Sequence, residues 1–312
     1  MSFDKANTRI VFMGTPEIAS VSLRGLLEAG FQVVGVITNP DKPMGRKKIL
    51  TPSPVKVVAL EHGIPVFQPV KIRLEYDFLE PLKPDVIVTM AYGQIVPQAV
   101  LDIPTRGCIN LHGSLLPKYR GAGPMQAAIL NGEKETGVTL MEMVAAMDAG
   151  RMYDKIAFPI EEDDDYGTIS NKMAVAAKEL IVKDLLPYMN GGLEGIPQDE
   201  SQVTIAGKIK PEDEHLDLSL PGDAFLRLLK AISPTPGGYC FYEGTKFKLL
   251  KARLLGETTL PTGTLTREKG ALCLAVGGKL LRLDTVQPEG KKPMDGAAFL
   301  NGHPDANGKK LD

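Results

Sequence analysis

Short apolar runs alternate with amphipathic stretches through residues 1–189. Runs typical of β-strands cover residues 9–13, 31–38, 85–90, 107–111, 137–143 and 153–158, and helical stretches are expected at 55–62, 124–130 and 168–189. A further helix is expected between the first two runs, where Thr15 can cap, Pro16 suits the first turn and Gly30 can end the helix. This alternation predicts an α/β domain with a mainly parallel sheet.

The pattern changes after residue 189. Residues 190–210 are rich in Gly and polar side chains and lack sustained periodicity, which predicts a linker between two domains. Beyond it, a helical stretch at 223–232 is followed by strand-like segments at 238–242, 246–254, 271–276 and 280–286. We therefore expect a larger domain over residues 1–189 and a small OB-like β-barrel over residues 211–312, a fold that often contacts nucleic acid.

Size and composition agree with two globular domains. With 312 residues the chain exceeds one domain of roughly 100–150 residues, and a hydrophobic fraction of 43% with 24% charged residues excludes collagen-like and disordered chains. No apolar run approaches the roughly 20 residues of a membrane helix, and the polar start MSFDKANTRI is unlike a signal peptide. Cys108, Cys240 and Cys273 lack disulfide or metal-ligand spacing, so we expect reduced thiols in a cytoplasmic protein without a metal.

The net charge of −2 conceals an uneven distribution of charge. Residues 1–207 carry −5 and residues 208–312 carry +3, a difference that fits a polyanionic partner but also arises on ordinary solvated surfaces. A stronger local signal lies at residues 41–56, where Asp41 is outnumbered by five cationic side chains. The five are Lys42, Arg46, Lys47, Lys48 and Lys56. Such a Gly- and Pro-containing loop either binds phosphate or is a mobile, solvated loop without a ligand.

The candidate chemistry is concentrated at residues 107–123, GCINLHGSLLPKYRGAG. A strand that ends here presents Asn110 and His112 on one face, at the carboxyl edge where α/β proteins bind their ligands. An amide beside an imidazole can donate hydrogen bonds to a developing oxyanion, and the imidazole can move a proton. Asp148, in a turn between two later strands, can orient the imidazole and raise its pKa. The alternative is that Asn110 and His112 cap the strand and Asp148 serves only the turn.

Other polar residues carry weaker signals. The loop after the first strand has only Gly14 of the GxGxxG pattern, which argues against a dinucleotide site. Ser114 has no accompanying general-base motif, and we interpret it as structural. The acidic run at residues 161–165 is interpreted as a solvated loop, and the three remaining histidines provide no metal cluster.

The residues around Asn110, His112 and Asp148 carry a resemblance to a known family. With SLLP at 114–117 and the following KYRG, they resemble the catalytic trio and its neighbours in the 10-formyltetrahydrofolate-dependent formyltransferases. The segments VGVITNPDKPMGRKKILTPSPVK and GIPVFQP, at 34–56 and 63–69, resemble the members that act on methionyl-tRNA. The resemblance covers essentially the whole chain, and it implies a Rossmann-like formyltransferase domain followed by an OB-like tRNA-binding domain.

The resemblance also implies a reaction and the residues that perform it. The formyl group of 10-formyltetrahydrofolate would pass to the α-amino group of initiator methionyl-tRNA, with the trio as catalytic residues and without a metal. Residues that hold tetrahydrofolate would be Met90, Ala91, Tyr92, Gly93, Ile95, Val96, Ser114, Leu115, Leu116 and Pro117. Residues that bind tRNA would be Lys42, Arg46, Lys47 and Lys48, in a loop one residue shorter than the family's GRGKK. Because one chain supplies the whole site, we expect a monomer.

Three other classes remain as alternatives. The first is a sister enzyme with the same donor: a glycinamide ribonucleotide formyltransferase, a sugar-nucleotide N-formyltransferase, or the hydrolase part of formyltetrahydrofolate dehydrogenase. The basic loop at 41–56 favours tRNA over each of these, because a small acceptor gains little from five cations. The second, an inactive RNA-binding module, is disfavoured by the intact trio. The third, a NAD-dependent dehydrogenase, is disfavoured by the single glycine at position 14.

Overall fold

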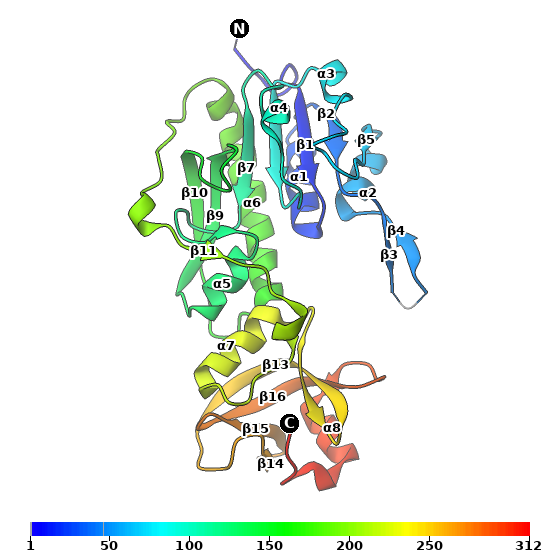
Figure 1. The fold of residues 1–312 in the computed structure, drawn as a ribbon, viewed down its shortest axis with the longest axis vertical. Coiled ribbons are helices and arrows are strands. Elements are labelled where there is room, and N and C mark those ends of the chain that lie inside the picture. The colour runs from blue at the N-terminus through cyan, green and yellow to red at the C-terminus, as the bar shows by residue number, and fades with distance from the viewer. Residues whose placement is uncertain (1, 46) are drawn as a thin grey trace. The chain divides into compact units, whose positions relative to one another are not determined.

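The computed structural model describes residues 2–45 and 47–312 (Figure 1). Contacts divide the chain into two compact units. The first unit comprises residues 1–121, 136–158 and 170–206, and the second comprises 122–135, 159–169 and 207–312. Residues 122–135 and 159–169, which we expected in the first domain, therefore belong to the second unit as two insertions. Most of the predicted linker at 190–210 belongs to the first unit.

In the described part of the chain, a seven-stranded sheet forms the centre of the first unit, with the strand order β10-β9-β7-β6-β1-β2-β5. The β1–β2, β1–β6, β2–β5 and β6–β7 pairs are parallel, and β9 pairs antiparallel with β7, which confirms the predicted mainly parallel sheet. Parallel strands are covered on both faces, so every residue of β1 and β6 is buried. The strands are β1 (Ile10–Gly14), β2 (Val33–Ile37), β5 (Val66–Phe67), β6 (Val86–Met90), β7 (Cys108–His112), β9 (Glu135–Glu142) and β10 (Met152–Pro159).

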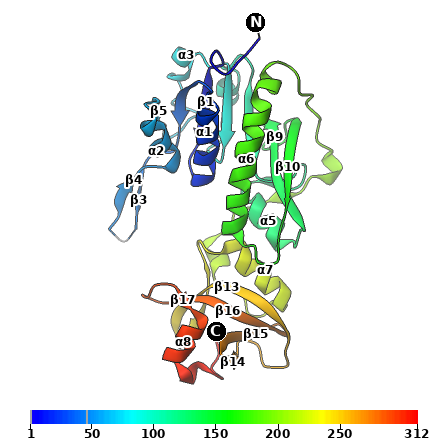
Figure 2. The same ribbon diagram turned by 180° about the vertical axis from the view of Figure 1, so that it is seen from behind.

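Helices α1 and α6 lie side by side against one face of this sheet (Figure 2), where Lys178 Nζ is 2.6 Å from Glu28 Oε2. The expected cap of α1 by Thr15 is wrong: Pro16 is the N-cap residue, and the Thr15 hydroxyl instead donates to Tyr92 O at 3.1 Å. The cap of α2 is Ser53, whose hydroxyl accepts from Lys56 N. The helices of this unit are α1 (Glu17–Glu28), α2 (Pro54–Glu61), α3 (Leu79–Leu82), α4 (Gln98–Leu101) and, in its greater part, α6 (Tyr166–Met189).

Two short strand pairs add to the first unit. The segment predicted as a basic loop forms an antiparallel hairpin of β3 (Lys42–Met44) and β4 (Ile49–Thr51), and Arg46 lies outside the described residues. In the second pair, β8 (Arg120–Gly121) is parallel to β11 (Ile205–Ala206). β11 lies in the predicted linker, where it comes after the short 3-10 helix η1 (Glu200–Gln202). That linker therefore packs as part of the unit that contains the sheet.

The second unit is a mainly antiparallel sheet in the order β12-β13-β16-β15-β14, with β17 paired to β16. The two insertions belong to it because Arg227 Nε of α7 donates to Leu130 O of α5, and Gly167 N donates to Ser233 O. Of the strands and α-helices of this unit, the sequence analysis did not predict β14, β17 or α8. The elements are α5 (Pro124–Leu130), η2 (Pro211–Glu214), α7 (Gly222–Ile232), β12 (Gly238–Tyr242), β13 (Thr245–Glu257), β14 (Leu265–Glu268), β15 (Ala271–Val276), β16 (Lys279–Pro288), β17 (Met294–Asp295), α8 (Gly296–Gly302) and η3 (Pro304–Ala306).

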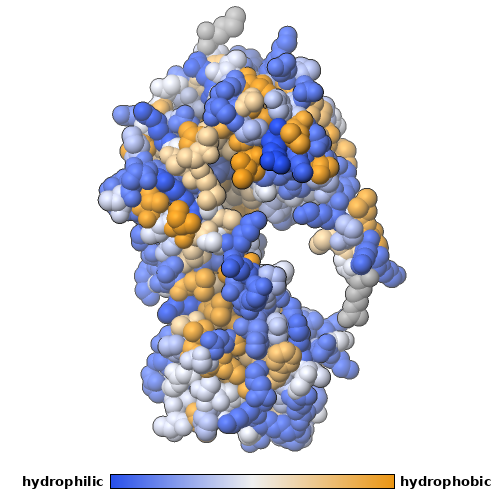
Figure 3. Space-filling view, viewed as in Figure 1, coloured by the Kyte–Doolittle hydropathy of each residue, from blue (hydrophilic) through white to orange (hydrophobic). Residues whose placement is uncertain are grey.

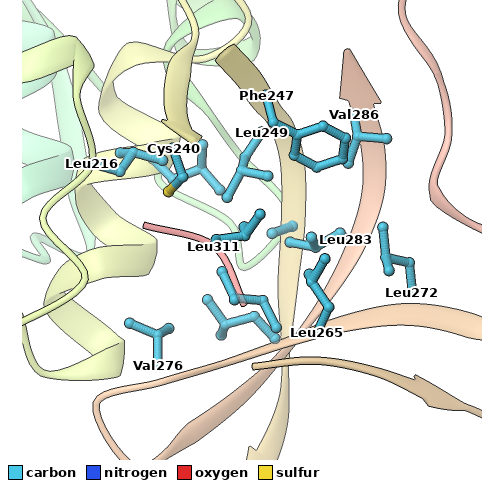
Figure 4. Close-up of a cluster of buried hydrophobic side chains, with 14 of the residues drawn as sticks. Leu216, Cys240, Phe247, Leu249, Leu265, Leu272, Val276, Leu283, Val286 and Leu311 are labelled. Atoms are coloured by element: carbon cyan, nitrogen blue, oxygen red, sulfur yellow. The ribbon is translucent and has the colours of Figure 1, made fainter. Parts of the chain in front are cut away.

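Residues 309–312 close this sheet into the predicted barrel. Asp312 exchanges two main-chain hydrogen bonds with Phe241 of β12, while Leu265 N of β14 donates to Lys309 O. Since β12 and β14 are the two ends of the strand order, one short segment satisfies both edges. Leu311 is 2% exposed and reaches into the apolar cluster shown in Figure 4. Across the described residues, no helix is both long and apolar enough to cross a membrane.

The closing segment predicts a stability difference between two neighbouring substitutions. Leu311→Ala leaves a cavity in the barrel core and is expected to lower the free energy of unfolding by about 2–5 kcal/mol. Lys310→Ala removes an exposed side chain and is the matched control, expected to change the free energy by less than about 0.5 kcal/mol. Urea unfolding of the full chain measures both, and equal effects would show that Leu311 is not a core residue.

Asp184 of α6 is a buried carboxyl group beneath β10. It is 4% exposed, and its Oδ2 atom has no hydrogen-bond partner among the residues described. Lys183 Nζ lies 3.5 Å from it and 2.7 Å from Asp154. Burial, followed by the neighbouring carboxyl group of Asp154, raises the pKa of Asp184 from its ordinary 3.8 to about 6. The fold therefore favours the neutral form of this carboxyl group.

The raised pKa of Asp184 predicts a pH-dependent effect of removing its charge. Its contribution to stability is fully present below pH 3.8 and is lost as the pH rises through about 6. Asp184→Asn, which is neutral at every pH, is therefore expected to gain about 2–3 kcal/mol over the unsubstituted chain at pH 8 and little at pH 4. Glu179→Gln, on the exposed side of the same helix, is the control in urea unfolding at both values. A gain independent of pH would contradict the assignment.

Candidate active site

Asn110 and His112 project from one face of β7, at the carboxyl end of the strand. Asn110 lies opposite Thr89 of β6 and Met141 of β9, and His112 lies opposite Thr139. Asn110 is half-buried, and within the described residues its carboxamide has no hydrogen-bond partner. An amide with two unused N–H donors at the end of a buried strand is suited to a ligand oxygen that carries negative charge.

His112 is buried and is oriented through a main-chain atom. Its Nε2 atom lies 2.9 Å from Tyr119 O. Because a carbonyl oxygen can only accept a hydrogen bond, this contact assigns a hydrogen to Nε2. The other nitrogen, Nδ1, lies 3.7 Å from Asp148 Oδ2, within ion-pair range but longer than a hydrogen bond. In the neutral imidazole, Nδ1 is therefore the nitrogen without a hydrogen, and it faces the Asp148 carboxylate.

Asp148 comes from the segment between β9 and β10, and its side chain is also held by the main chain. Its Oδ2 atom accepts a hydrogen bond of 2.8 Å from Gly121 N. The residue has a φ of 50°, which is uncommon for a residue with a side chain and turns the carboxylate towards His112. The structure thus brings together the three residues that the sequence analysis selected from separate segments.

Residues 119–121, which supply these main-chain contacts, are held in turn by the segment 204–206. Tyr119 N donates to Thr204 Oγ1 at 2.8 Å, and Arg120 N donates to Thr204 O at 2.9 Å. At Gly121, with a φ of 111°, a Cβ atom would lie 2.5 Å from Ala206 O, so only glycine permits this approach. Sequence reasoning missed this contribution because it assigned residues 190–210 to a linker, and the short apolar alternation at 203–206 was the one available signal.

The predicted tetrahydrofolate residues after β6 divide into buried and exposed positions. Met90 and Tyr92 are each 2% exposed, and burial raises the pKa of the Tyr92 phenol, whose oxygen has no partner among the residues described. Ala91 and Gly93 are exposed with φ values of 48° and 87°, and Ile95 is 89% exposed. This segment offers a ligand main-chain groups and the Ile95 side chain.

The second set of predicted tetrahydrofolate residues, 114–117, forms a turn after β7. The Ser114 hydroxyl is fully buried and donates to Lys118 O at 2.7 Å. Leu116 is also buried, and its N–H donates to Thr139 Oγ1. The side chains of Ser114 and Leu116 therefore shape the turn, while Leu115 and Pro117 are half-buried.

A cavity of about 520 Å³ opens along the same strand. Cys108, two residues before Asn110 and on the same face of β7, lies in its wall, and burial raises the pKa of this thiol to about 12. Residues 142–144, which lead into the segment with Asp148, form another wall. None of the predicted tetrahydrofolate residues lines it. Separated segments build the cavity, so no local pattern pointed to it. Further lining residues are Gln98, Leu101, Tyr153 and Tyr188.

The β3–β4 hairpin carries fewer free charges than the sequence count indicated. Lys56 Nζ is 2.7 Å from Asp41 Oδ2, and this hydrogen bond lowers the pKa of Asp41. Lys42, Lys47 and Lys48 are exposed and have no ion pair within the described ranges. Exposed apolar residues lie among the cations, as Figure 3 shows. These residues are Met44, Ile49 and Leu50, each about 60% exposed. The hairpin therefore presents both charge and apolar surface.

The base of the hairpin is joined to the segment after β6. Gln68 Nε2 donates to Asn39 O and to Asp41 Oδ1, and Asn39 Nδ2 donates to Tyr92 O at 2.7 Å. Gln94 Nε2 donates to Asn39 Oδ1 at 2.8 Å. Amide side chains thus link the hairpin to the same edge of the sheet that carries Asn110.

Two expectations from the sequence concern the remaining polar side chains: that they hold no metal ion and that the acidic run is a solvated loop. Within residues 2–45 and 47–312, no three His, Cys, Asp or Glu side chains lie close enough together to hold a metal ion. The acidic run at 161–165 is partly ordered by its own contacts: Asp164 Oδ2 accepts from Glu161 N, and Lys230 Nζ donates to Glu162 O.

Comparisons with known proteins match both units. A family described as formyl transferase matches residues 8–185, and one described as formyl transferase, C-terminal domain, matches residues 208–304. A methionyl-tRNA formyltransferase of Bacillus subtilis (strain 168) is 45% identical over 300 residues, covering 95% of each chain. One from Enterococcus faecalis is 43% identical over 300 residues, covering 95% of this chain and 96% of the relative.

Solved structures share the fold at lower identity. HypX from Aquifex aeolicus, in complex with tetrahydrofolic acid, is 19% identical with a TM-score of 0.67, over 94% of this chain and 47% of that one. An N-formyltransferase from Helicobacter canadensis, in complex with folinic acid and dTDP-3-aminofucose, is 21% identical with a TM-score of 0.68, over 90% of this chain and 99% of that one. Since the curated relatives match along almost the whole chain and both family descriptions agree with them, the chain belongs to the methionyl-tRNA formyltransferase family.

Proposed function

We propose that Asn110, His112 and Asp148 transfer the formyl group of 10-formyltetrahydrofolate to the α-amino group of initiator methionyl-tRNA. The observation that carries this assignment is the convergence of an unpartnered amide, an oriented imidazole and a carboxylate at the carboxyl end of β7. Family membership supplies the reaction and its substrates, and this geometry supports the choice of residues.

Two features of the first unit fit the donor. The cavity beside Cys108 has the size of a site for a drug-sized molecule, and it begins two residues before Asn110 on the same face of β7. The exposed main chain at residues 91–93 and the exposed Ile95 side chain offer polar and apolar contacts after the neighbouring strand. When bound, the donor supplies an activated formyl group. We assign the heterocycle of the donor to the cavity beside Cys108 and the neighbouring segment 91–95. Residues 90–96 and 114–117 would shape the edge of the sheet near the trio.

The trio divides the work of acyl transfer. As the amine nitrogen attacks the formyl carbon, negative charge develops on the formyl oxygen, and the Asn110 amide donates hydrogen bonds to it. The nitrogen that attacks must lose a proton, and His112 accepts it at Nδ1, since Nε2 is bonded to Tyr119 O. Asp148, 3.7 Å from Nδ1, stabilises the resulting imidazolium. His112 then donates this proton to the nitrogen of the donor as its bond to the formyl carbon breaks.

The hairpin and the second unit are assigned to the tRNA. Lys42, Lys47 and Lys48 are free to approach phosphates, and Arg46, which lies outside the described residues, belongs to the same turn in sequence. We assign catalysis to residues 1–189 together with residues 190–206, which pack with them in the first unit, and a tRNA-binding role to residues 211–312. We further propose that the protein is a cytoplasmic monomer, because one chain supplies the whole trio and its acceptor is made where translation takes place.

Replacing Asn110 tests the catalytic assignment. Asn110→Ala is expected to lower kcat by roughly 10²–10³-fold, because it removes donors that act on the developing oxyanion. The KM values for both substrates and the unfolding midpoint are expected to change little, because the amide has no partner among the residues described. Asn131→Ala, at the exposed end of α5, is the control. A normal kcat for Asn110→Ala, measured with 10-formyltetrahydrofolate and charged initiator tRNA, would reject the assignment.

Removing the free lysines tests the hairpin. The triple variant Lys42→Ala, Lys47→Ala, Lys48→Ala is expected to raise the KM for methionyl-tRNA and leave the KM for the donor unchanged. Each lost phosphate contact also lowers the slope of log affinity against log salt concentration by about one. Lys5→Ala, before the amino end of β1, is the control for general loss of charge. Unchanged tRNA affinity and salt slope in the triple variant would show that the hairpin does not contact the tRNA.

A further inference from the structure

Gln198 lies in the predicted linker, yet its side chain contacts the segment that carries Asp148. It is 9% exposed, and its Nε2 atom donates to Asp148 O at 2.7 Å and to Gly150 O at 2.9 Å. One amide group thus uses both of its hydrogens on two carbonyl oxygens of the same turn. Because these two bonds tie residues 148 and 150 to one side chain, Gln198 restrains the path of the main chain at residues 148–150.

The orientation of the Gln198 amide is fixed from its other side. Its Oε1 atom accepts a hydrogen bond of 2.9 Å from Nε of Arg120, which is itself buried. The two remaining nitrogens of Arg120 are paired with Glu200, at 2.7 and 3.3 Å. Since the guanidinium can only donate, Oε1 must face Arg120 and the NH2 group must face the turn. Glu200, Arg120 and Gln198 therefore form a chain of charge-assisted hydrogen bonds that ends on the Asp148 main chain.

The turn needs such a restraint because its conformation is not a relaxed one. Asp148 has a φ of 50°, in the left-handed region that residues with a Cβ atom seldom adopt. At Gly150 a Cβ atom would lie 2.0 Å from Glu142 O, so this turn is also packed closely against the end of β9. Gly121 N holds the Asp148 carboxylate, but nothing in that hydrogen bond fixes the carbonyl on the other side of the residue.

We propose that Gln198 is a positioning residue for formyl transfer, which acts by fixing the main chain of Asp148 so that the carboxylate faces His112 Nδ1. This inference rests on the proposed role of the trio. It also gives the segment after α6 a supporting role in the site. Gln198 holds the main chain of Asp148, and Thr204, six residues later, holds the main chain of Tyr119, which contacts His112. Glutamine fits this position because glutamate lacks the two donors and asparagine is one methylene shorter.

The test is the isosteric substitution Gln198→Glu. It keeps the shape of the side chain and an acceptor for Arg120, but it places a carboxylate against two carbonyl oxygens. We expect kcat to fall about 10- to 100-fold, with the KM for methionyl-tRNA unchanged. Gln202→Glu, an exposed glutamine four residues later, is the matched control and is expected to keep the normal kcat. Gln198→Met, which removes the polar group without adding charge, is expected to lower kcat in the same way.

A double-substitution cycle separates positioning from general destabilisation. In an Asp148→Ala background, Gln198→Glu is expected to change kcat less than about twofold, because the group it positions is already gone. Independent, multiplying effects would overturn the proposal, as would a normal kcat in both Gln198 variants. All rates are measured well below each variant's unfolding midpoint, determined by circular dichroism. A normal kcat in Asp148→Ala alone would instead refute the role of the trio, so the two failures are distinguishable.

Discussion

The placement of residues 119–121 between β7 and the segment 204–206 is the constraint on which the arrangement of His112 and Asp148 depends. Tyr119 O fixes one nitrogen of His112, and Gly121 N fixes the carboxylate of Asp148. Thr204 holds the main chain of Tyr119 and Arg120 from the opposite side. Because main-chain groups have no alternative rotamers, these contacts restrict the orientation of both the imidazole and the carboxylate.

Rigid and exposed parts of the site have different tasks. His112 is oriented by buried main-chain contacts, whereas Asn110 keeps its amide unpaired within the described chain. A catalytic donor that is free before the substrate arrives loses no internal hydrogen bond when it binds the developing charge. The hairpin shows a similar division: the ion pair of Asp41 with Lys56 joins its base to α2, while the lysines nearer the turn remain exposed.

The features that could be predicted from the sequence are those that a periodic pattern of buried residues determines. β1 and β6 were predictable because strands covered on both faces must be apolar, and Asn110 and His112 were predictable because residues two apart share one face. Gln198 was not, since a single glutamine in a Gly-rich stretch carries no periodic signal, and its partners Arg120 and Asp148 lie far away in sequence. The cavity beside Cys108 could not be predicted for the same reason, because its walls come from segments far apart in sequence.

The bridge that residues 309–312 make between β12 and β14 has a consequence for the order of folding during synthesis. A ribosome delivers the chain from its amino end, and compact units form as their last contacts emerge. The first unit has all of its segments once residue 206 has emerged, including Gln198 and Thr204. The barrel, by contrast, keeps two open edges until residues 309–312 leave the ribosome. Nascent chains of this protein therefore pass through a stage in which the trio is assembled while unpaired strand edges remain exposed to other chains.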